Sequence, residues 1–202
     1  MNSEVIENHK IFLERIAFFK KYGLDQMQER EFILSQAMPI QGNILEIGTG
    51  KGHFALALAK RGYKFTSIDI DQSGQRIAQL NLAYYDLLEQ VDFKIEDAEH
   101  LSFVDKSFDL IFCINVYHHL TNPLPVLEEM LRVLSVKGRI VLADFNVKGM
   151  EIVEQCHVAE GGTHECFSQN LDSARKFFSD KGLPMQQTSS FTQDLIIVSR
   201  SK

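Results

Sequence analysis

The chain has 202 residues, of which 45% are hydrophobic and 24% charged, a composition typical of one globular domain. Its formal net charge of −6 disfavours a nucleic-acid partner, because affinity for nucleic acid rests largely on Lys and Arg that meet phosphates. No apolar run approaches the roughly 18 residues that cross a bilayer, and the acidic start of the chain lacks the basic segment of a secretory signal. Three cysteines without a framework spacing indicate a reducing setting. We therefore expect a cytoplasmic protein that engages neither membrane nor nucleic acid.

The expected elements alternate between helix and strand. Apolar residues at near-helical spacing predict an amphipathic helix over residues 4–21, and a second helix over 25–37 stops before Pro39. Short apolar runs and helical patterns then take turns along the chain. The expected strands cover residues 43–47, 64–68, 91–95, 109–114 and 138–144, and the expected helices cover residues 53–61, 73–88 and 123–134. Such alternation predicts a parallel sheet with helices on both faces.

The last part of the chain breaks this alternation. A helix is expected over residues 171–180, followed by two strands over 186–191 and 195–199 that a short turn separates. So short a connection permits only antiparallel pairing. We therefore expect an α/β fold with a Rossmann-like, seven-stranded sheet that is mostly parallel, ends in a C-terminal antiparallel hairpin, and has an N-terminal helical extension.

A glycine-rich loop follows the first expected strand and opens the next helix. It reads Glu-Ile-Gly-Thr-Gly-Lys-Gly from Glu46 to Gly52. Free backbone N–H groups and the positive end of the helix dipole lie at such a loop, and glycine lets a ligand approach the backbone. The spacing is G-x-G-x-G, which differs from the G-x-G-x-x-G of dinucleotide binders and from the P-loop pattern. With Glu46 beside it, the loop favours a cationic ligand without phosphate, such as S-adenosylmethionine.

Four further segments follow this loop in a characteristic order. They are the acidic strand end at 67–71, the stretch at 93–103, the fourth strand with its continuation at 107–120, and the stretch at 129–139. With the loop, they make residues 42–144 resemble the class I S-adenosylmethionine-dependent methyltransferases, in particular the type 11 small-molecule group. Val136 and Lys137 depart from the usual Lys-Pro of the last segment. The resemblance implies S-adenosylmethionine as cofactor and a small molecule as methyl acceptor.

The resemblance also implies which residues bind the cofactor. Asp69 would accept hydrogen bonds from the ribose hydroxyls, and Asp97 with the N–H that follows it would hold the adenine. The expected cofactor-binding residues are Glu46, Gly48, Thr49, Gly50, Gly52, Asp69, Ile70, Asp97, Ala98 and Asn115. Each acid has an alternative role: Asp69 or Asp71 caps the next helix, and Asp97 caps a helix over 98–101.

The acceptor is harder to infer, because transfer from a sulfonium needs positioning and exclusion of water more than a catalytic group. Asn115 ends the fourth strand and is expected to face the methyl group, and Asn115-Val-Tyr-His lacks the Asn-Pro-Pro-Tyr pattern of base and glutamine methyltransferases. His118 and His119 are the candidate catalytic residues, with a structural role under the loop as the alternative. Tyr117 is a candidate acceptor-binding residue.

The segment from Cys156 to Cys166 holds two cysteines, two histidines and two glutamates within eleven residues, where this family commonly builds its substrate lid. Three interpretations stay open. It forms a soft-metal or metalloid site for methylating a metalloid or thiol acceptor; or His157, Glu160 and His164 shape an acceptor pocket; or it is a glycine-turned loop with incidental polar residues. The spacing matches no familiar zinc pattern, so no metal ligand is assigned.

We expect one methyltransferase domain in four parts. These are an N-terminal helical cap (1–40), a cofactor-binding core (41–145), a substrate lid (146–170), and the last helix with the hairpin (171–202). Two other functions compete with catalysis of methyl transfer. One is a nicotinamide oxidoreductase, which the glycine spacing, Glu46 and the hairpin oppose. The other is a methyltransferase-fold module that binds the cofactor without catalysis of its own. A homodimer stays open as the assembly.

Overall fold

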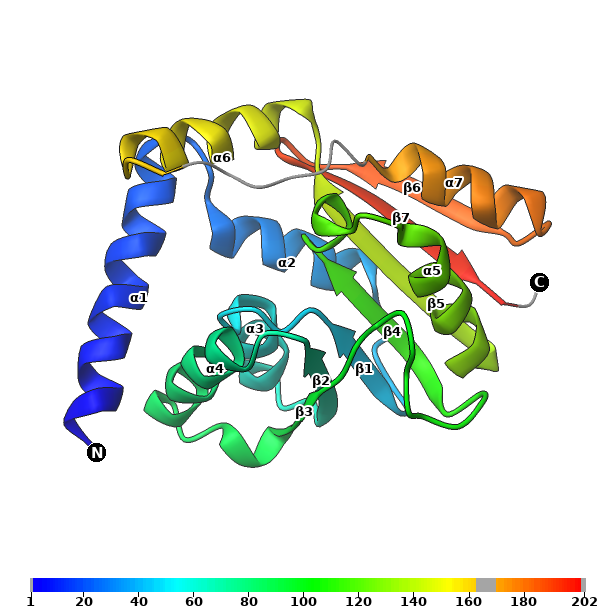
Figure 1. Ribbon diagram of the computed structural model, residues 1–202, viewed down its shortest axis with the longest axis horizontal. Coiled ribbons are helices and arrows are strands. Elements are labelled where there is room, and N and C mark those ends of the chain that lie inside the picture. The colour runs from blue at the N-terminus through cyan, green and yellow to red at the C-terminus, as the bar shows by residue number, and fades with distance from the viewer. Residues whose placement is uncertain (1, 163–169, 201–202) are drawn as a thin grey trace.

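A seven-stranded sheet with the strand order β3-β2-β1-β4-β5-β7-β6 organises the chain (Figure 1). The computed structural model describes residues 2–162 and 170–200. The strands are β1 (Ile44–Ile47), β2 (Phe65–Asp69), β3 (Val91–Ile95), β4 (Phe108–Ile114), β5 (Leu134–Phe145), β6 (Met185–Ser189) and β7 (Gln193–Ser199). The helices are α1 (Ser3–Lys21), α2 (Gln26–Gln36), α3 (His53–Lys60), α4 (Gln72–Tyr84), α5 (Pro123–Val133), α6 (Val147–Ala159) and α7 (Leu171–Asp180), with 3₁₀ turns η1 (Leu88–Gln90) and η2 (Tyr117–His119).

The pairing confirms the expected topology. β1 pairs in parallel with β2 and β4, β2 with β3, and β4 with β5, whereas β7 runs antiparallel to both β5 and β6. The chain turns from β1 toward β2 and β3, and later returns on the other side of β1 with β4. This reversal leaves a crevice beyond the carboxyl ends of β1 and β4, which is where open α/β sheets bind ligands.

Helices cover both faces of the sheet, and this explains the nearly continuous apolar sequence of β4. Phe112 belongs to a buried cluster with residues of α2 and α3, such as Ile33 and Phe54. Its neighbour Ile111 belongs to the cluster on the opposite face, with Leu127 of α5 and Phe178 of α7 among its members. Since alternate side chains of a strand point to opposite faces, both sets of β4 side chains must be apolar.

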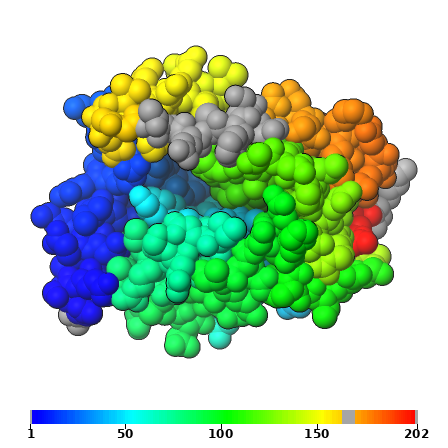
Figure 2. Space-filling view, viewed as in Figure 1, coloured from blue at the N-terminus to red at the C-terminus, as the bar shows by residue number. Residues whose placement is uncertain are grey.

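Helix α1 lies at one end of the molecule, against α4 and α6 (Figures 1 and 2). The His9 ring stacks on Tyr84 of α4 with 3.5 Å between ring centroids. Asn8 Nδ2 donates to Asn81 Oδ1 at 2.7 Å, and Asn81 Nδ2 in turn donates to the Lys51 carbonyl at 2.9 Å. The N-terminal helix is therefore tied through α4 to the glycine-rich loop.

Two elements differ from their expected bounds by more than two residues, and one helix was not expected. The helix expected over 73–88 ends at Tyr84, because Asp86 takes a left-handed backbone conformation with φ 59°. The strand expected from 138 begins at Leu134, which pairs with Phe108 before the register shifts, so that Leu110 pairs with Arg139. Helix α6 was not expected: Asn146 caps it by accepting from the Gly149 N–H.

Helix α6 occupies the first part of the segment that was expected as a substrate lid. Its buried side chains include Ile152, Val153 and Cys156, which pack with Phe19 of α1 and with Leu24 of the connection between α1 and α2. Across the described ranges, no helix has the length and the apolarity that crossing a bilayer requires.

Candidate functional site

A cavity of about 510 Å³ lies at the carboxyl ends of β1, β2 and β4. Four segments meet there: the glycine-rich loop, the end of β2, the stretch after β3, and the turn after β4. Of the residues expected to act, those that line the cavity are Gly48, Gly50, Asp69, Ile70, Asp97, Ala98, Asn115 and His119. Tertiary folding thus brings together residues from all four sequence segments.

Two other hollows of comparable volume lie away from this crevice. One, of about 570 Å³, is lined by residues such as Asn43 and Lys64 near the amino ends of β1 and β2. The other, of about 780 Å³, lies between α4 and β3 and includes Asp71 and Arg76 in its lining. Only the 510 Å³ cavity sits at the reversal of strand order, which is the position that α/β sheets use for ligands.

The three loop glycines have different physical roles. Gly48 has φ 85°, and a Cβ there would lie 2.1 Å from Val116 Cγ2. Gly50 has φ 49°, and a Cβ there would meet nothing within 4 Å, so it faces the open cavity. Gly52 begins α3, and a Cβ there would lie 2.6 Å from Ala78 Cβ of α4. Gly48 and Gly52 therefore permit close packing around the loop, and Gly50 leaves room for a ligand.

Asp69 and Asp71 divide the two roles that the sequence left open. Asp69 lines the cavity, and its carboxylate accepts from the Gly50 N–H at 2.6 Å and from the Asp71 N–H at 2.8 Å. Asp71 caps α4 and accepts from the Ser73 and Gly74 N–H groups. The helix cap is thus Asp71, and Asp69 is the acid that lines the cavity.

Asp97 stands in a turn, so the alternative in which it caps a helix over 98–101 is wrong. Its side chain accepts from the Glu99 N–H at 2.9 Å, a local turn that leaves Asp97 exposed at the cavity. Glu96 accepts from both the N–H and the hydroxyl of Ser102, which ties the two ends of this loop together.

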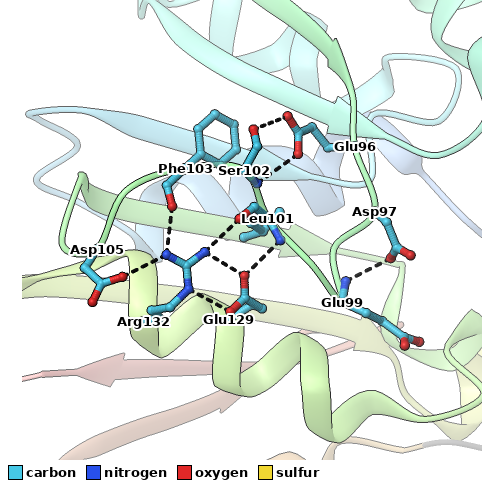
Figure 3. A network of polar contacts seen from close by, with 9 residues as sticks. All are labelled: Glu96, Asp97, Glu99, Leu101, Ser102, Phe103, Asp105, Glu129 and Arg132. Carbon is cyan, nitrogen blue, oxygen red and sulfur yellow. Dashed lines mark hydrogen bonds and ion pairs between the residues drawn. The ribbon is translucent and has the colours of Figure 1, made fainter.

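Helix α5 holds the loop that carries Asp97 (Figure 3). Arg132 donates to the carbonyls of Leu101 and Phe103, at 2.8 and 2.7 Å, and to Asp105 and Glu129. Glu129 accepts from the Leu101 N–H at 2.8 Å. The Arg132 hydrogen bonds to Glu129 and Asp105 raise the pKa of Arg132, so the charge persists at any working pH. The loop that carries Asp97 is therefore held in place by the charged side chain of Arg132.

Three residues of the glycine-rich loop segment that were expected to bind the cofactor do not line the cavity, namely Glu46, Thr49 and Gly52. Glu46 is 1% exposed, and Ser67 Oγ donates to its Oε2 at 2.5 Å. Burial raises the pKa of Glu46 to about 8, so the carboxyl is mostly neutral at pH 7 and supplies little of the expected negative charge. Thr49 is buried with its hydroxyl 2.6 Å from Ser67 Oγ, and Gly52 is buried against α4. These residues support the loop from below.

Asn115 is held in an unusual position at the end of β4. Its φ is 57°, a left-handed conformation that few residues other than glycine adopt. Its N–H donates to the Ala143 carbonyl at 2.8 Å, whereas the buried Oδ1 has no hydrogen-bond partner among the described residues. A buried acceptor left open beside a cavity, on a strained backbone, is typical of a ligand-binding position.

Three consecutive residues after β4 point in different directions. His119 is exposed and lines the cavity. His118 is 1% exposed, and Asp144 at the end of β5 accepts from its N–H at 2.8 Å and lies 2.6 Å from its Nδ1. Tyr117 is fully buried, with its hydroxyl 2.6 Å from Ser173 Oγ of α7. Burial raises the pKa of Tyr117 and removes it from the cavity, contrary to its expected place in an acceptor pocket.

The cysteine- and histidine-containing segment is only partly described. Cys156 is fully buried, and burial raises the pKa of its thiol. His157 is partly buried, and burial followed by the nearby Arg15 lowers its pKa. Glu160 ends α6 and forms an ion pair with Arg15 of α1 at 2.5 Å. His164 and Cys166 lie outside the described residues, and within those residues no group of three His, Cys, Asp or Glu is arranged to hold a metal.

Sequence reasoning missed two features of this site. Glu96 and Glu99 also line the cavity, on either side of Asp97. Asp144, the partner of His118, is the last residue but one of β5 and lies at the carboxyl end of that strand, as Asp69 does in β2, and that placement is the signal that could have found it. Its contact with His118 could not have been read from spacing, because the two residues are 26 positions apart.

Comparisons with known proteins show which family this chain is similar to. Residues 45–142 match the family model described as a methyltransferase domain. The uncharacterized methyltransferase YcgJ of Bacillus subtilis is 30% identical over 143 residues, which cover 71% of this chain and 52% of the relative. The ubiquinone/menaquinone biosynthesis C-methyltransferase UbiE of Hydrogenovibrio crunogenus is 32% identical, over 62% of this chain and 50% of the relative.

Among solved structures, a SAM-dependent methyltransferase from Aquifex aeolicus superimposes with a TM-score of 0.64 at 18% identity, over 84% of this chain and 88% of that one. At this identity the likeness establishes the fold. The chain spans about half the length of the curated relatives it matches.

Proposed function

Because the chain belongs to the class I S-adenosylmethionine-dependent methyltransferases, we propose that it transfers the methyl group of S-adenosylmethionine to a small-molecule acceptor by in-line displacement. The observation that carries this proposal is a single cavity lined by Gly50, Asp69, Asp97 and Asn115. These residues come from four separate segments of the chain, and together they offer open space at Gly50 and three polar side chains.

The residues fit this cofactor in three respects. Gly50 leaves open space where a side chain would obstruct a ligand. A carboxylate has about four lone-pair sites, so Asp69 can keep its two backbone donors and still accept from a ribose diol. The open Oδ1 of Asn115 offers an acceptor for a donor of the bound molecule.

The chemistry of the cofactor determines what the protein itself has to contribute. When bound, S-adenosylmethionine supplies a methyl group that is already activated by its sulfonium, and the leaving group is a neutral thioether. The protein mainly has to orient the acceptor in line and exclude water. Asp69, Asp97 and Asn115 line the cavity with polar groups, and Val116 and Leu120 of the turn after β4, with Val126 of α5, line it with apolar ones.

For an acceptor that loses a proton, His119 is the candidate base. It lines the cavity, and its ring centroid lies 3.9 Å from that of His118. Asp144 fixes His118 through two contacts, one with its backbone N–H and one with its ring Nδ1, and these set the orientation of the ring. His118 is thus a positioning residue for the turn, and His119 is the residue that meets the acceptor.

Two features support a small acceptor. The net charge of −6 disfavours a polyanion. The relative UbiE is described as a C-methyltransferase of ubiquinone and menaquinone biosynthesis, which is the biosynthesis of small molecules.

Calorimetric titration with S-adenosylmethionine, followed by a search for S-adenosylhomocysteine produced with a metabolite extract, tests the proposal. We expect binding of the cofactor in the wild type and turnover that His119→Ala reduces without changing cofactor affinity. Tight binding with no turnover in any extract would favour a module that holds the cofactor without catalysis. Absence of binding would refute the proposal.

A further inference from the structure

Strand β3 forms one edge of the sheet, and across the described ranges no segment pairs with its outer side. Its sequence is Val-Asp-Phe-Lys-Ile, and its register with β2 is regular throughout. Strand β6, at the opposite edge, presents exposed polar side chains such as Gln186 and Gln187 and offers little apolar surface. An edge strand such as β3, which carries apolar side chains and has neither a proline nor a bulge, can pair with a further strand.

The backbone groups of Phe93 and Ile95 face this open edge. On the inner side, the Glu96 N–H donates to the Asp69 carbonyl of β2 at 3.1 Å. Alternate residues of a strand direct both backbone groups to the same side, so Lys94 faces β2 as Glu96 does, whereas Phe93 and Ile95 face outward. Across the described ranges, no turn, cap or loop bonds to the backbone of either residue. Strand β3 therefore has donors and acceptors ready for another strand.

The side chains of β3 are complementary to those of a second β3. If two copies pair antiparallel with Phe93 opposite Phe93, Asp92 of each copy lies opposite Lys94 of the other, and Val91 lies opposite Ile95. Opposite charges directly across a strand pair stabilise it, and like charges destabilise it. A shift of two residues in either direction would place Asp92 opposite Asp92 or Lys94 opposite Lys94. The charges therefore select one register and favour a second copy of this chain as the partner.

Apolar surface beside this edge is open to solvent. Val91 and Phe93 pack against the core cluster that includes Leu82 of α4, and a hollow of about 780 Å³ between α4 and β3 has Ile70, Phe93 and Ile95 in its lining. Ile70 is 72% exposed and Ile95 is 50% exposed. In the antiparallel pair, the Phe93 and Ile95 side chains of the two copies would lie next to one another and cover part of this surface.

We propose that the chain forms a symmetric dimer in which the two β3 strands pair antiparallel, with Phe93 opposite Phe93 and each Asp92 opposite Lys94 of the other copy. The two sheets then become one continuous sheet. The interface is short, because β3 has five residues, so the Kd lies in the micromolar range. The dimer does not depend on the proposed methyl transfer, although Ile70 lines both this hollow and the 510 Å³ cavity.

Asp92→Lys and Lys94→Asp test the register by exchange of charge. Each variant alone would place like charges opposite one another, so its self-association should weaken by about 10-fold or more. Mixed in equal amounts, the two variants restore opposite charges at both positions, and their heterodimer should form as tightly as the wild-type dimer. Sedimentation velocity between about 1 μM and 1 mM measures each Kd.

Lys137→Asp is the matched control for Lys94→Asp. It makes the same change of charge at an exposed residue of β5, and β2, β1 and β4 lie between that strand and β3. The control should associate as the wild type does. Thermal unfolding of every variant shows that it is folded at the temperature of the measurement.

Ile95→Pro tests the backbone pairing by a separate route. Proline lacks the N–H that would donate to the Val91 carbonyl of the other copy. Because this N–H faces away from β2, the hydrogen bonds within each sheet are retained, and an edge strand tolerates proline at such a position. The variant should unfold near the wild-type temperature and remain monomeric over the same range of concentration.

The proposal is supported if each charge variant loses the dimer and their mixture recovers it. A wild type that stays monomeric at the highest concentration overturns the proposal. A dimer that both charge variants and Ile95→Pro retain also overturns it, because the contact then lies elsewhere. Loss of the dimer in each charge variant without recovery in the mixture would rule out the register with Phe93 opposite Phe93.

Discussion

His118 Nδ1 lies 2.6 Å from Asp144 Oδ1, and both side chains are almost completely buried where β4 and β5 end. The same carboxylate accepts from the His118 backbone N–H, so one acid on β5 determines both the ring orientation and the path of the turn after β4. His119 follows in that turn and faces the cavity. The pair therefore links the core of the sheet to the wall that the acceptor would meet.

Asp144→Asn is expected to lower kcat about 10- to 100-fold, because an amide loses the charge-assisted hydrogen bonds that hold His118. The cofactor affinity should change little, since Asp144 does not line the cavity. Steady-state kinetics and calorimetry measure the two quantities. A large loss of cofactor affinity with an unchanged kcat would contradict the positioning role.

Substitutions of Asp69 and Asp71 are expected to affect different properties, cofactor binding in the first case and stability in the second. Asp69→Ala is expected to weaken cofactor binding by about 1–3 kcal/mol, because it removes hydrogen bonds to a charged acceptor. Asp71→Ala is expected to lower the free energy of unfolding by about 0.5–2 kcal/mol through loss of the α4 cap, with binding retained. Calorimetric titration and urea denaturation of both variants check this. Reversed effects would reassign the ribose contact to Asp71.

Gly48→Ala should destabilise the glycine loop, because the new Cβ would lie 2.1 Å from Val116 Cγ2 at a φ of 85°. We expect a loss of about 1–3 kcal/mol in the free energy of unfolding. The double variant with Val116→Ala should recover part of that loss, since only the backbone strain then remains. Gly50→Ala is the control, because its Cβ meets nothing within 4 Å and should cost less stability.

Glu46 is expected to make the protein less stable as the pH rises, whereas an acid in an ion pair makes a protein more stable as the pH rises. Burial raises the pKa of its carboxyl from 4.5 to about 8, so the folded state binds a proton that the unfolded state releases over this range. The contribution of Glu46 to the free energy of unfolding is therefore complete below about pH 4.5 and falls as the pH rises toward 8, by about 1 kcal/mol per pH unit.

Glu46→Gln isolates this effect, since the amide oxygen can still accept from Ser67 and cannot ionise. Urea denaturation of both proteins at pH 5, 6, 7 and 8 should give a steeper decline for the wild type. Parallel curves for the two proteins would mean that Glu46 is ionised in the folded state at neutral pH.

Local patterns in the sequence determined most of the fold and half of the site. The alternation of apolar runs and helical spacing predicted the parallel sheet, because each run needs only its own periodicity to be recognised. The short turn before residue 193 required the antiparallel hairpin, which β6 and β7 form. Gly50, Asp69 and Asp97 could be predicted to lie close together, because each ends or follows a parallel strand. The carboxyl ends of parallel strands lie at the same edge of the sheet.

The tertiary structure alone decided which of these side chains reach the cavity. Glu46, Thr49 and Tyr117 stand beside cavity residues in the sequence, yet their side chains point into the core, because pleat and loop geometry turn neighbours to opposite sides. The contact of His118 with Asp144 joins positions far apart in the chain. No local periodicity encodes such a contact, since it arises only when separate strands and helices pack together.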